Sequence, residues 1–330
     1  TVSSVHIANE YERPEVKPDM VSSGDIVEAE ETWVRGYNGT GTVVGIIDTG
    51  IDPSHKDMIL TDESKAKLTK SDVDASISKN KLPGKYHTAK VPYGYNYYDK
   101  NQEILDLGSD ASMHGMHVGG TVGANGSKDA GGIKGIAPET QLLALKVFGN
   151  DSEMPSTWGD IYVKAIDDAI LLGADVLNMS LGSTAGFQSP EDPEQKAVER
   201  AVNNGVLMAI SAGNSAQFSD GYADPLAINP DIGLVGSPSV SKDSISVASL
   251  ENTHVFVDKF EFTIGGTTYS AGYKTQSSPL PLDVFGTTEK DVVYVGNGHP
   301  DQYQGKDVAG KIVFAVRTAS NPNYGEIQKQ

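Results

Sequence analysis

The sequence predicts an α/β protein built on a parallel β-sheet, followed by a β-rich segment. Five short apolar runs of the kind buried on both faces of a parallel sheet occur before residue 250, and segments with helical periodicity separate some of them. Alternation of strands and helices is typical of a parallel sheet covered by helices. The five runs are residues 42–48, 140–147, 174–180, 205–211 and 244–249.

Residues 157–171 and 193–204 are predicted to be helices. The first segment places Ile161, Ala165 and Ile166 on one broad apolar face. The second begins with proline and is followed by Gly205, which is the expected order of helix start and stop residues. A further short helix is expected within residues 112–126, a stretch that holds two histidines three residues apart.

The character of the chain changes near residue 252. Three β-rich stretches follow, "FEFTIGGTTY", "DVVYVG" and "KIVFAV", separated by Gly, Pro and Asp turns. We therefore expect one domain over residues 25–251 and the start of a second over 252–330. Residues 1–24 contain the proline-interrupted stretch "ERPEVKPDM" and are expected to be a linker or the end of a pro-segment.

Composition narrows the possible functions. The chain has 330 residues with 26 basic and 44 acidic side chains, a net charge of −18, which argues against nucleic acid or an anionic membrane as a partner. No apolar run approaches the roughly 20 residues that a membrane-spanning helix needs. Cysteine is absent, so disulfides, thiolate nucleophiles and thiolate metal sites are excluded. The chain begins at Thr1 without a basic and apolar leader, which we interpret as a processed, secreted product.

Three polar stretches could carry chemistry. Asp48 closes the first strand, where it could accept a hydrogen bond from an imidazole and fix its tautomer, or form only a turn. His114 and His117 are neighbours on one helix face. A zinc site would need a third ligand, and the spacing is not that of "HExxH", so a metallohydrolase is disfavoured. Asn214 in "SAGNS" could donate to an oxyanion or only shape its turn.

Taken together, these stretches resemble the subtilisin-like serine proteases. The similarity runs in order through "VVGIIDTGIDPSHKDM", "HGMHVGGTVGANG", "GIAPETQLLALKVF", "ADVLNMSLG" and "ISAGNS". "KLTKSDVD", "KVPYGYNY" and "LGADVLNMSLGS" are still more similar to the lactocepin-like cell-envelope proteinases of Gram-positive bacteria. The resemblance implies a subtilisin-like fold over 25–251 and a secreted or cell-wall location. "DVVYVG" and "DVAGKIVFAVR" resemble the start of a protease-associated domain inserted into such enzymes.

The resemblance also implies roles for particular residues. Asp48 would orient the imidazole, His114 would be the general base, His117 would pack inward and Asn214 would donate to the oxyanion. Met116 stands where the family usually has threonine. Ser180, Leu181 and Gly182 resemble the strand against which the substrate backbone pairs by strand addition. Ser211, Ala212 and Gly213 would form the other wall of the pocket.

No cofactor is expected for the chemistry, but a structural calcium ion is expected from the resemblance. Asp57 matches a calcium ligand of many subtilisins, and residues 124–132 fall where carbonyl ligands would come. A solvated loop is the alternative, because calcium needs about six to eight converging oxygens.

The family nucleophile, a serine in Gly-Thr-Ser-Met-Ala or a close variant, has no counterpart in residues 1–330. We therefore expect a secreted endopeptidase that acts on protein or peptide substrates, with its serine beyond residue 330 or on a partner fragment. Maturation of a zymogen is expected between residues 10 and 25. The alternative is a protease-like module that binds peptides without cleaving them.

Overall fold

The computed structural model describes residues 10–12, 23–107, 111–151, 156–184, 186–214, 217–218, 231–232, 234–250, 258–273 and 289–316. Contacts divide the chain into two units, Thr1–Val255 and Phe256–Gln330. Most of the residues expected to be a linker or pro-segment, 1–9 and 13–22, lie outside the described part. Among the described residues, no helix has the length and apolar character needed to cross a membrane.

The first unit contains the predicted parallel sheet. Its six strands are ordered β10-β7-β6-β2-β4-β3, and every neighbouring pair is parallel. The five predicted apolar runs all supply strands, and β3 is an additional one. The strands are β2 (Val43–Asp48), β3 (Tyr93–Asn96), β4 (Gln141–Lys146), β6 (Val176–Met179), β7 (Leu207–Ser211) and β10 (Ile245–Val247).

The two central strands are buried on both faces, as their continuous apolar sequences predict. All residues of β2 and β4 are buried. Because successive side chains point to opposite faces, Ile47 and Leu145 contribute to one apolar cluster while Ile46 and Ala144 contribute to the other. The sheet is therefore held between two cores.

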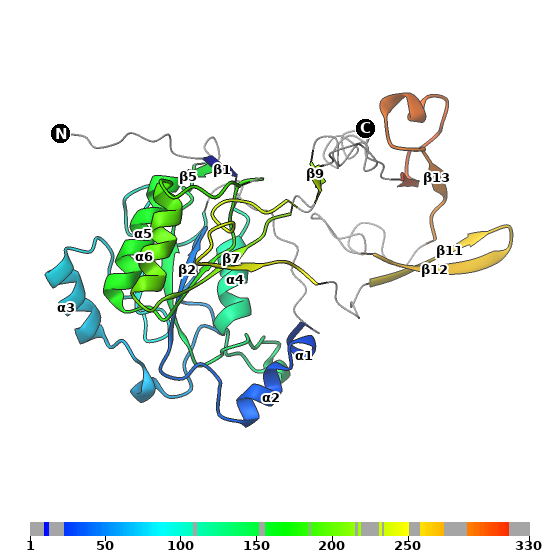
Figure 1. Ribbon diagram of the computed structural model, residues 1–330. Coiled ribbons are helices and arrows are strands. Elements are labelled where there is room, and N and C mark those ends of the chain that lie inside the picture. The colour runs from blue at the N-terminus through cyan, green and yellow to red at the C-terminus, as the bar shows by residue number, and fades with distance from the viewer. Residues whose placement is uncertain are drawn as a thin grey trace. The chain divides into compact units, whose positions relative to one another are not determined.

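Helices cover both faces of the sheet. The first core includes residues of α5 (Gly159–Leu172) and α6 (Pro193–Asn203), which pack side by side (Figure 1). The second is covered by apolar side chains of α4 (His114–Gly123). The remaining helices of this unit are α1 (Ser23–Ile26), α2 (Ala29–Val34) and α3 (Lys70–Asn80), with 3₁₀ turns at Glu63–Lys65 and Lys128–Ala130. The predicted helices over 157–171 and 193–204 are thus present, as is the short helix within 112–126.

Small strand pairs complete the described structure. In the first unit, β1 (Glu10–Glu12) pairs with β5 (Ser156–Trp158), and β8 (Gln217–Phe218) pairs with β9 (Asp231–Ile232). The second unit has a hairpin of β11 (Asp258–Ile264) and β12 (Thr267–Tyr273), a parallel pair of β13 (Val292–Tyr294) and β14 (Ile312–Phe314), and a 3₁₀ turn at Pro300–Tyr303. These strands lie on the three β-rich stretches of the sequence.

Candidate active site

The predicted site residues gather at the carboxyl edge of the sheet. Asp48 is the last residue of β2, and the strands on either side of β2 are β4 and β6. Ser180, Leu181 and Gly182 directly follow β6. Ser211 ends the next strand, β7, and Ala212, Gly213 and Asn214 follow it. Ligand sites of parallel α/β sheets lie at this edge, so the fold places all of these segments where chemistry is expected.

Helix α4 starts in close contact with the end of β2, and Gly115 makes that contact possible. The Gly115 N–H donates to the Thr49 hydroxyl at 3.0 Å. A Cβ on Gly115 would lie 2.5 Å from the carbonyl oxygen of Gly50, a distance that side chains do not reach. Glycine therefore lets the first turn of α4 approach the strand end closely enough to bring His114 to Asp48.

Asp48 and His114 form the hydrogen bond that the sequence predicted. Nδ1 of His114 lies 2.8 Å from Oδ1 and 3.0 Å from Oδ2 of Asp48. The backbone N–H of Thr49 also donates to Oδ1, at 2.7 Å. The Asp48 side chain is 1% exposed and that of His114 13%, so the bond is shielded from water while the imidazole keeps some exposure.

Burial raises the pKa of Asp48, and His114 opposes this rise through its hydrogen bond and its charge. The contact therefore favours the ionised carboxylate. An ionised Asp48 that accepts from Nδ1 fixes the tautomer in which Nε2 is free of a proton. That nitrogen can then act as a base.

His117 lies one turn further along α4 and is half-buried. Within the described residues, the carboxylate of Asp48 bonds to His114 and not to His117. Burial lowers the pKa of His117, and the charge of His114 lowers it further, so the neutral form is favoured. These properties suit a packing residue, and that role of His117 remains a prediction.

Asn214 is exposed and lies three residues beyond the end of β7. The preceding Gly213 has a φ of 100°, a left-handed conformation that glycine adopts without strain. The oxyanion role of Asn214 remains a prediction.

The two segments predicted to hold substrate are both tied to a loop that the sequence analysis did not single out. The N–H of Ser183 donates to the carbonyl of Ser237 at 3.0 Å, and the N–H of Gly236 donates to that of Ala212 at 3.0 Å. The hydroxyl of Ser237 is buried without a hydrogen-bond partner in the described structure. The sequence of this loop, "VGSPS", consists mainly of small residues typical of an ordinary turn, so it carries no distinctive signal.

The structure shows the contacts of Asp57, and the calcium site stays a prediction. One carboxylate oxygen accepts from Lys56 Nζ at 2.9 Å and the other from the N–H of Ile133 at 3.1 Å. Calcium would need several further oxygens; no group of three acidic or histidine side chains supplies them in the described part of the chain, so they would have to be backbone carbonyls. Both carboxylate oxygens thus have protein donors, and the Asp57 backbone carbonyl accepts the N–H of Asn125 at 2.8 Å, which ties Asp57 to the loop over 124–132.

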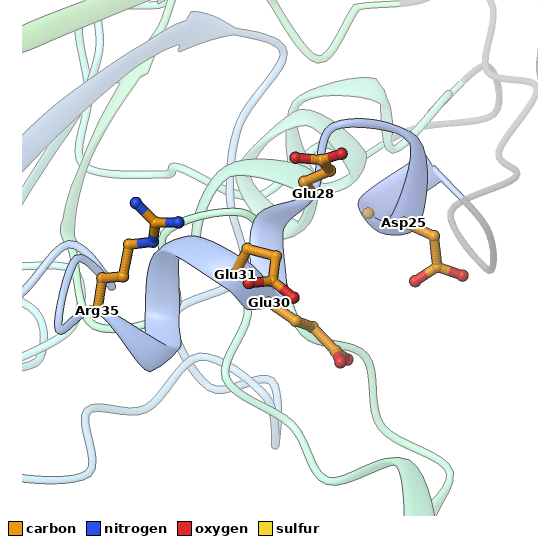
Figure 2. A pocket seen from close by; sticks show the side chains of 6 residues that line it. Asp25, Glu28, Glu30, Glu31 and Arg35 are labelled. Atoms are coloured by element: carbon orange, nitrogen blue, oxygen red, sulfur yellow. The ribbon is translucent and has the colours of Figure 1, made fainter.

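A surface hollow outside this edge carries no candidate site residue. It is lined by Gly24, Asp25, Glu28, Glu30, Glu31 and Arg35 of the α1–α2 region. Figure 2 shows that the carboxylates of Asp25 and Glu30 do not converge on one point. The hollow therefore presents dispersed acidic charge rather than a coordination sphere.

A buried aspartate that bonds a histidine in this way is the arrangement that the aspartate and histidine of a Ser-His-Asp triad have. Comparison with known proteins agrees with this class. The family model described as "Subtilase family" matches residues 39–325, and the chain belongs to that family. This confirms the resemblance and the fold inferred from the sequence.

Several curated relatives are proteinases. The chain is 45% identical over 254 residues to a PIII-type proteinase of Lactococcus lactis subsp. cremoris, covering 75% of this chain and 13% of that protein. It is 33% identical over 294 residues to a C5a peptidase of Streptococcus pyogenes, covering 86% and 24%. It is 30% identical over 311 residues to the minor extracellular protease Vpr of Bacillus subtilis, covering 92% and 31%. The chain thus spans less than a third of the length of these relatives.

Proposed function

We propose that this chain supplies the aspartate, the histidine and an oxyanion donor of a serine endopeptidase. The observation that carries the proposal is the buried hydrogen bond between Asp48 and His114 at the carboxyl edge of the sheet. Membership of the subtilase family and the proteinase names of the relatives support it.

The proposed reaction is acyl transfer. Nε2 of His114 removes the proton of a serine hydroxyl as its oxygen attacks the substrate carbonyl, and the imidazolium then returns the proton to the leaving amine. Water, activated by the same imidazole, then hydrolyses the acyl-enzyme and restores the serine. Asp48 stabilises the imidazolium through Nδ1. The amide of Asn214 donates to the oxygen that becomes negatively charged in the tetrahedral intermediate.

The nucleophilic serine is proposed to lie outside residues 1–330, because no stretch of this sequence matches the family's serine segment. Either one longer chain or a second fragment of a nicked enzyme would bring it to His114. We propose a secreted or cell-wall location, which the extracellular protease among the relatives supports.

Protein or peptide substrates are proposed to bind as an added strand. Main-chain groups after β6 and β7 would pair with the substrate, and the loop holding Gly236 and Ser237 would close the pocket between them. Sequence preference would come from the side chains that line this pocket.

The test is labelling with a fluorophosphonate, which reacts with activated serines. We expect no rapid labelling of the 330-residue chain alone, and labelling of the serine segment when both are folded together. His114→Ala should reduce labelling and turnover by about a thousandfold or more, because the base is lost. Labelling of the isolated chain would contradict the proposed division of the triad.

Asn214 requires its own comparison in the completed enzyme. Asn214→Ala should lower kcat by about 10²- to 10³-fold with little change in KM, as expected for an oxyanion donor. Asn204→Ala is the matched control, since in the described structure the Asn204 side chain donates to the Arg200 carbonyl at the end of α6, away from the carboxyl edge of the sheet. Equal activity of the Asn214 variant and the parent would reject the role, and a completed enzyme that never labels would favour the peptide-binding module.

A further inference from the structure

A buried ion pair next to the candidate dyad has no part in the chemistry described above. Lys146 ends β4 and is fully buried, and Asp106 is 4% exposed in the loop before α4. Lys146 Nζ lies 4.0 Å from Oδ1 of Asp106. Burying two charges costs desolvation free energy unless both are well hydrogen-bonded. The other hydrogen bonds of Lys146 and Asp106 therefore indicate which segments the pair connects.

Lys146 is attached to the aspartate side of the dyad. It is the register partner of Asp48 across the β2–β4 ladder. Its ammonium donates to the carbonyl of Thr49, the residue that follows Asp48. The N–H of Thr49 bonds the Asp48 carboxylate, and its hydroxyl accepts the N–H of Gly115. Lys146 thus fixes the turn that aims Asp48.

Asp106 is attached to the histidine side. Its Oδ2 accepts the N–H of Met113 at 2.9 Å. Met113 precedes His114 and has a φ of 56°, a left-handed conformation that costs energy for a residue with a side chain. Ser112 adds a second link, because its hydroxyl lies 3.5 Å from the same oxygen and accepts the N–H of His114 at 3.3 Å. Asp106 therefore holds the strained entry into α4.

We propose that Asp106 and Lys146 form a positioning pair that locks the ends of β2 and α4 together and so sets the Asp48–His114 hydrogen bond. The inference rests on the proposed function for its catalytic consequence. The negative charge of Asp106 also raises the pKa of Asp48. Neither residue touches the reacting atoms.

The direct test observes the dyad without any need for activity. An imidazole Nδ1 proton donated to a buried carboxylate gives a far-downfield proton NMR signal, which is assigned to His114 by its loss in His114→Ala. In Asp106→Asn and in Lys146→Met we expect this signal to move upfield or to vanish through faster exchange with water. Asp106→Asn is nearly isosteric and retains an acceptor for Met113, so it tests the charge in a chain that still folds.

Lys90→Met is the matched control. Lys90 is also buried, and it also donates to a backbone carbonyl, that of Pro138 at 2.7 Å, but no bond joins it to Asp48 or His114 in the described structure. The signal should persist in this variant. Near-UV circular dichroism checks the fold of each variant, and a Lys146→Met that fails to fold leaves the decision to Asp106→Asn.

The double variant and the completed enzyme extend the test. Because the two residues act as one unit, Asp106→Asn/Lys146→Met should shift the signal no further than the more severe single variant. In the completed enzyme, each single variant should lose about 10- to 100-fold in kcat with KM nearly unchanged. An unchanged signal in folded Asp106→Asn, or an equal loss in Lys90→Met, would overturn the positioning role. Absence of any activity with the signal behaving as expected would instead refute only the proposed function.

Discussion

At the residue scale, two glycines of α4 have opposite relations to their neighbours. A Cβ at Gly115 would meet backbone, 2.5 Å from the oxygen and 2.6 Å from the nitrogen of Gly50. A Cβ at Gly120 would find only the Ile133 side chain, at an ordinary contact distance of 3.5 Å. Glycine is therefore required by close approach at one position and merely weakens the helix at the other.

This difference gives a paired prediction. Gly115→Ala should lower the free energy of unfolding by about 1–3 kcal/mol, because backbone must move to admit the methyl group. It should also disturb the His114 Nδ1 proton signal. Gly120→Ala should raise the free energy of unfolding by up to about 1 kcal/mol, since alanine is the better helix former. Urea denaturation of both variants measures this, and equal effects would show that the approach of α4 to β2 is not limiting.

The Asp–His pair could be predicted from sequence, whereas the pair beneath it could not. Asp48 ends an apolar run and His114 lies in a glycine-rich stretch, so the predicted strand end and the family resemblance both indicated these two residues. Lys146 lies at the end of "QLLALK", a position at which a lysine side chain is expected to be exposed to solvent. Its burial and its hydrogen bond to Thr49 depend on the register between β4 and β2. The sequence of a single strand does not determine that register.

At the element scale, the central strands could be predicted from the sequence, whereas α3 and β3 could not. Continuous apolar runs mark strands with two buried faces. Helix α3 was missed because it buries only Val73 and has little apolar periodicity; its start is set instead by a capping box of Thr69 and Asp72. Strand β3, "YGYN", was missed because it contains glycine and no β-branched residue.

The C-terminal end of α4 carries a second buried cation, Lys90. A Cβ on Gly123 would lie 3.3 Å from Nζ of Lys90, which donates to the Pro138 carbonyl. Burial lowers the pKa of Lys90 to about 7, while the charge of Glu139 opposes the change. Above that pH the folded chain holds Lys90 neutral, whereas the unfolded chain keeps it protonated up to its ordinary pKa.

A pH dependence of stability follows. Between pH 7 and about pH 9.5 the unfolded chain binds more protons at Lys90 than the folded chain, so this residue's contribution to stability rises with pH, by at most about 1.4 kcal/mol per pH unit. Below pH 7 both states are protonated and the penalty is constant. Lys90→Met removes the dependence, so its stability advantage over the parent should be largest at or below pH 7 and should shrink towards pH 9.5. Urea titrations at several pH values measure the difference, and a constant difference would contradict the depressed pKa.

At the scale of the whole molecule, the two units differ in how much they bury. In the first, β2 and β4 are buried throughout and lie between two apolar cores. In the second, the described side chains of β11 and β12 are exposed or half-buried, as are those of β13 and β14. The sequence placed the change of character at residue 252, and contacts divide the chain after Val255. Identity of the second unit as a protease-associated domain remains a prediction.

Unequal burial predicts unequal protection of backbone amides. Opening free energies reach the global value only in well-packed elements, and a two-stranded hairpin without a covering layer is marginally stable. In hydrogen exchange on the intact chain, amides of β2 and β4 should therefore exchange slowest, at a rate set by global unfolding. Amides paired between β11 and β12 should exchange at least about a hundredfold faster, which corresponds to a stability roughly 3 kcal/mol lower. The exchange rates of the hairpin amides should also depend only weakly on urea concentration, because little surface is exposed when the hairpin opens. Equal protection of the hairpin and the sheet would show that the two units unfold together, and the division of the chain into separately stable parts would then be wrong.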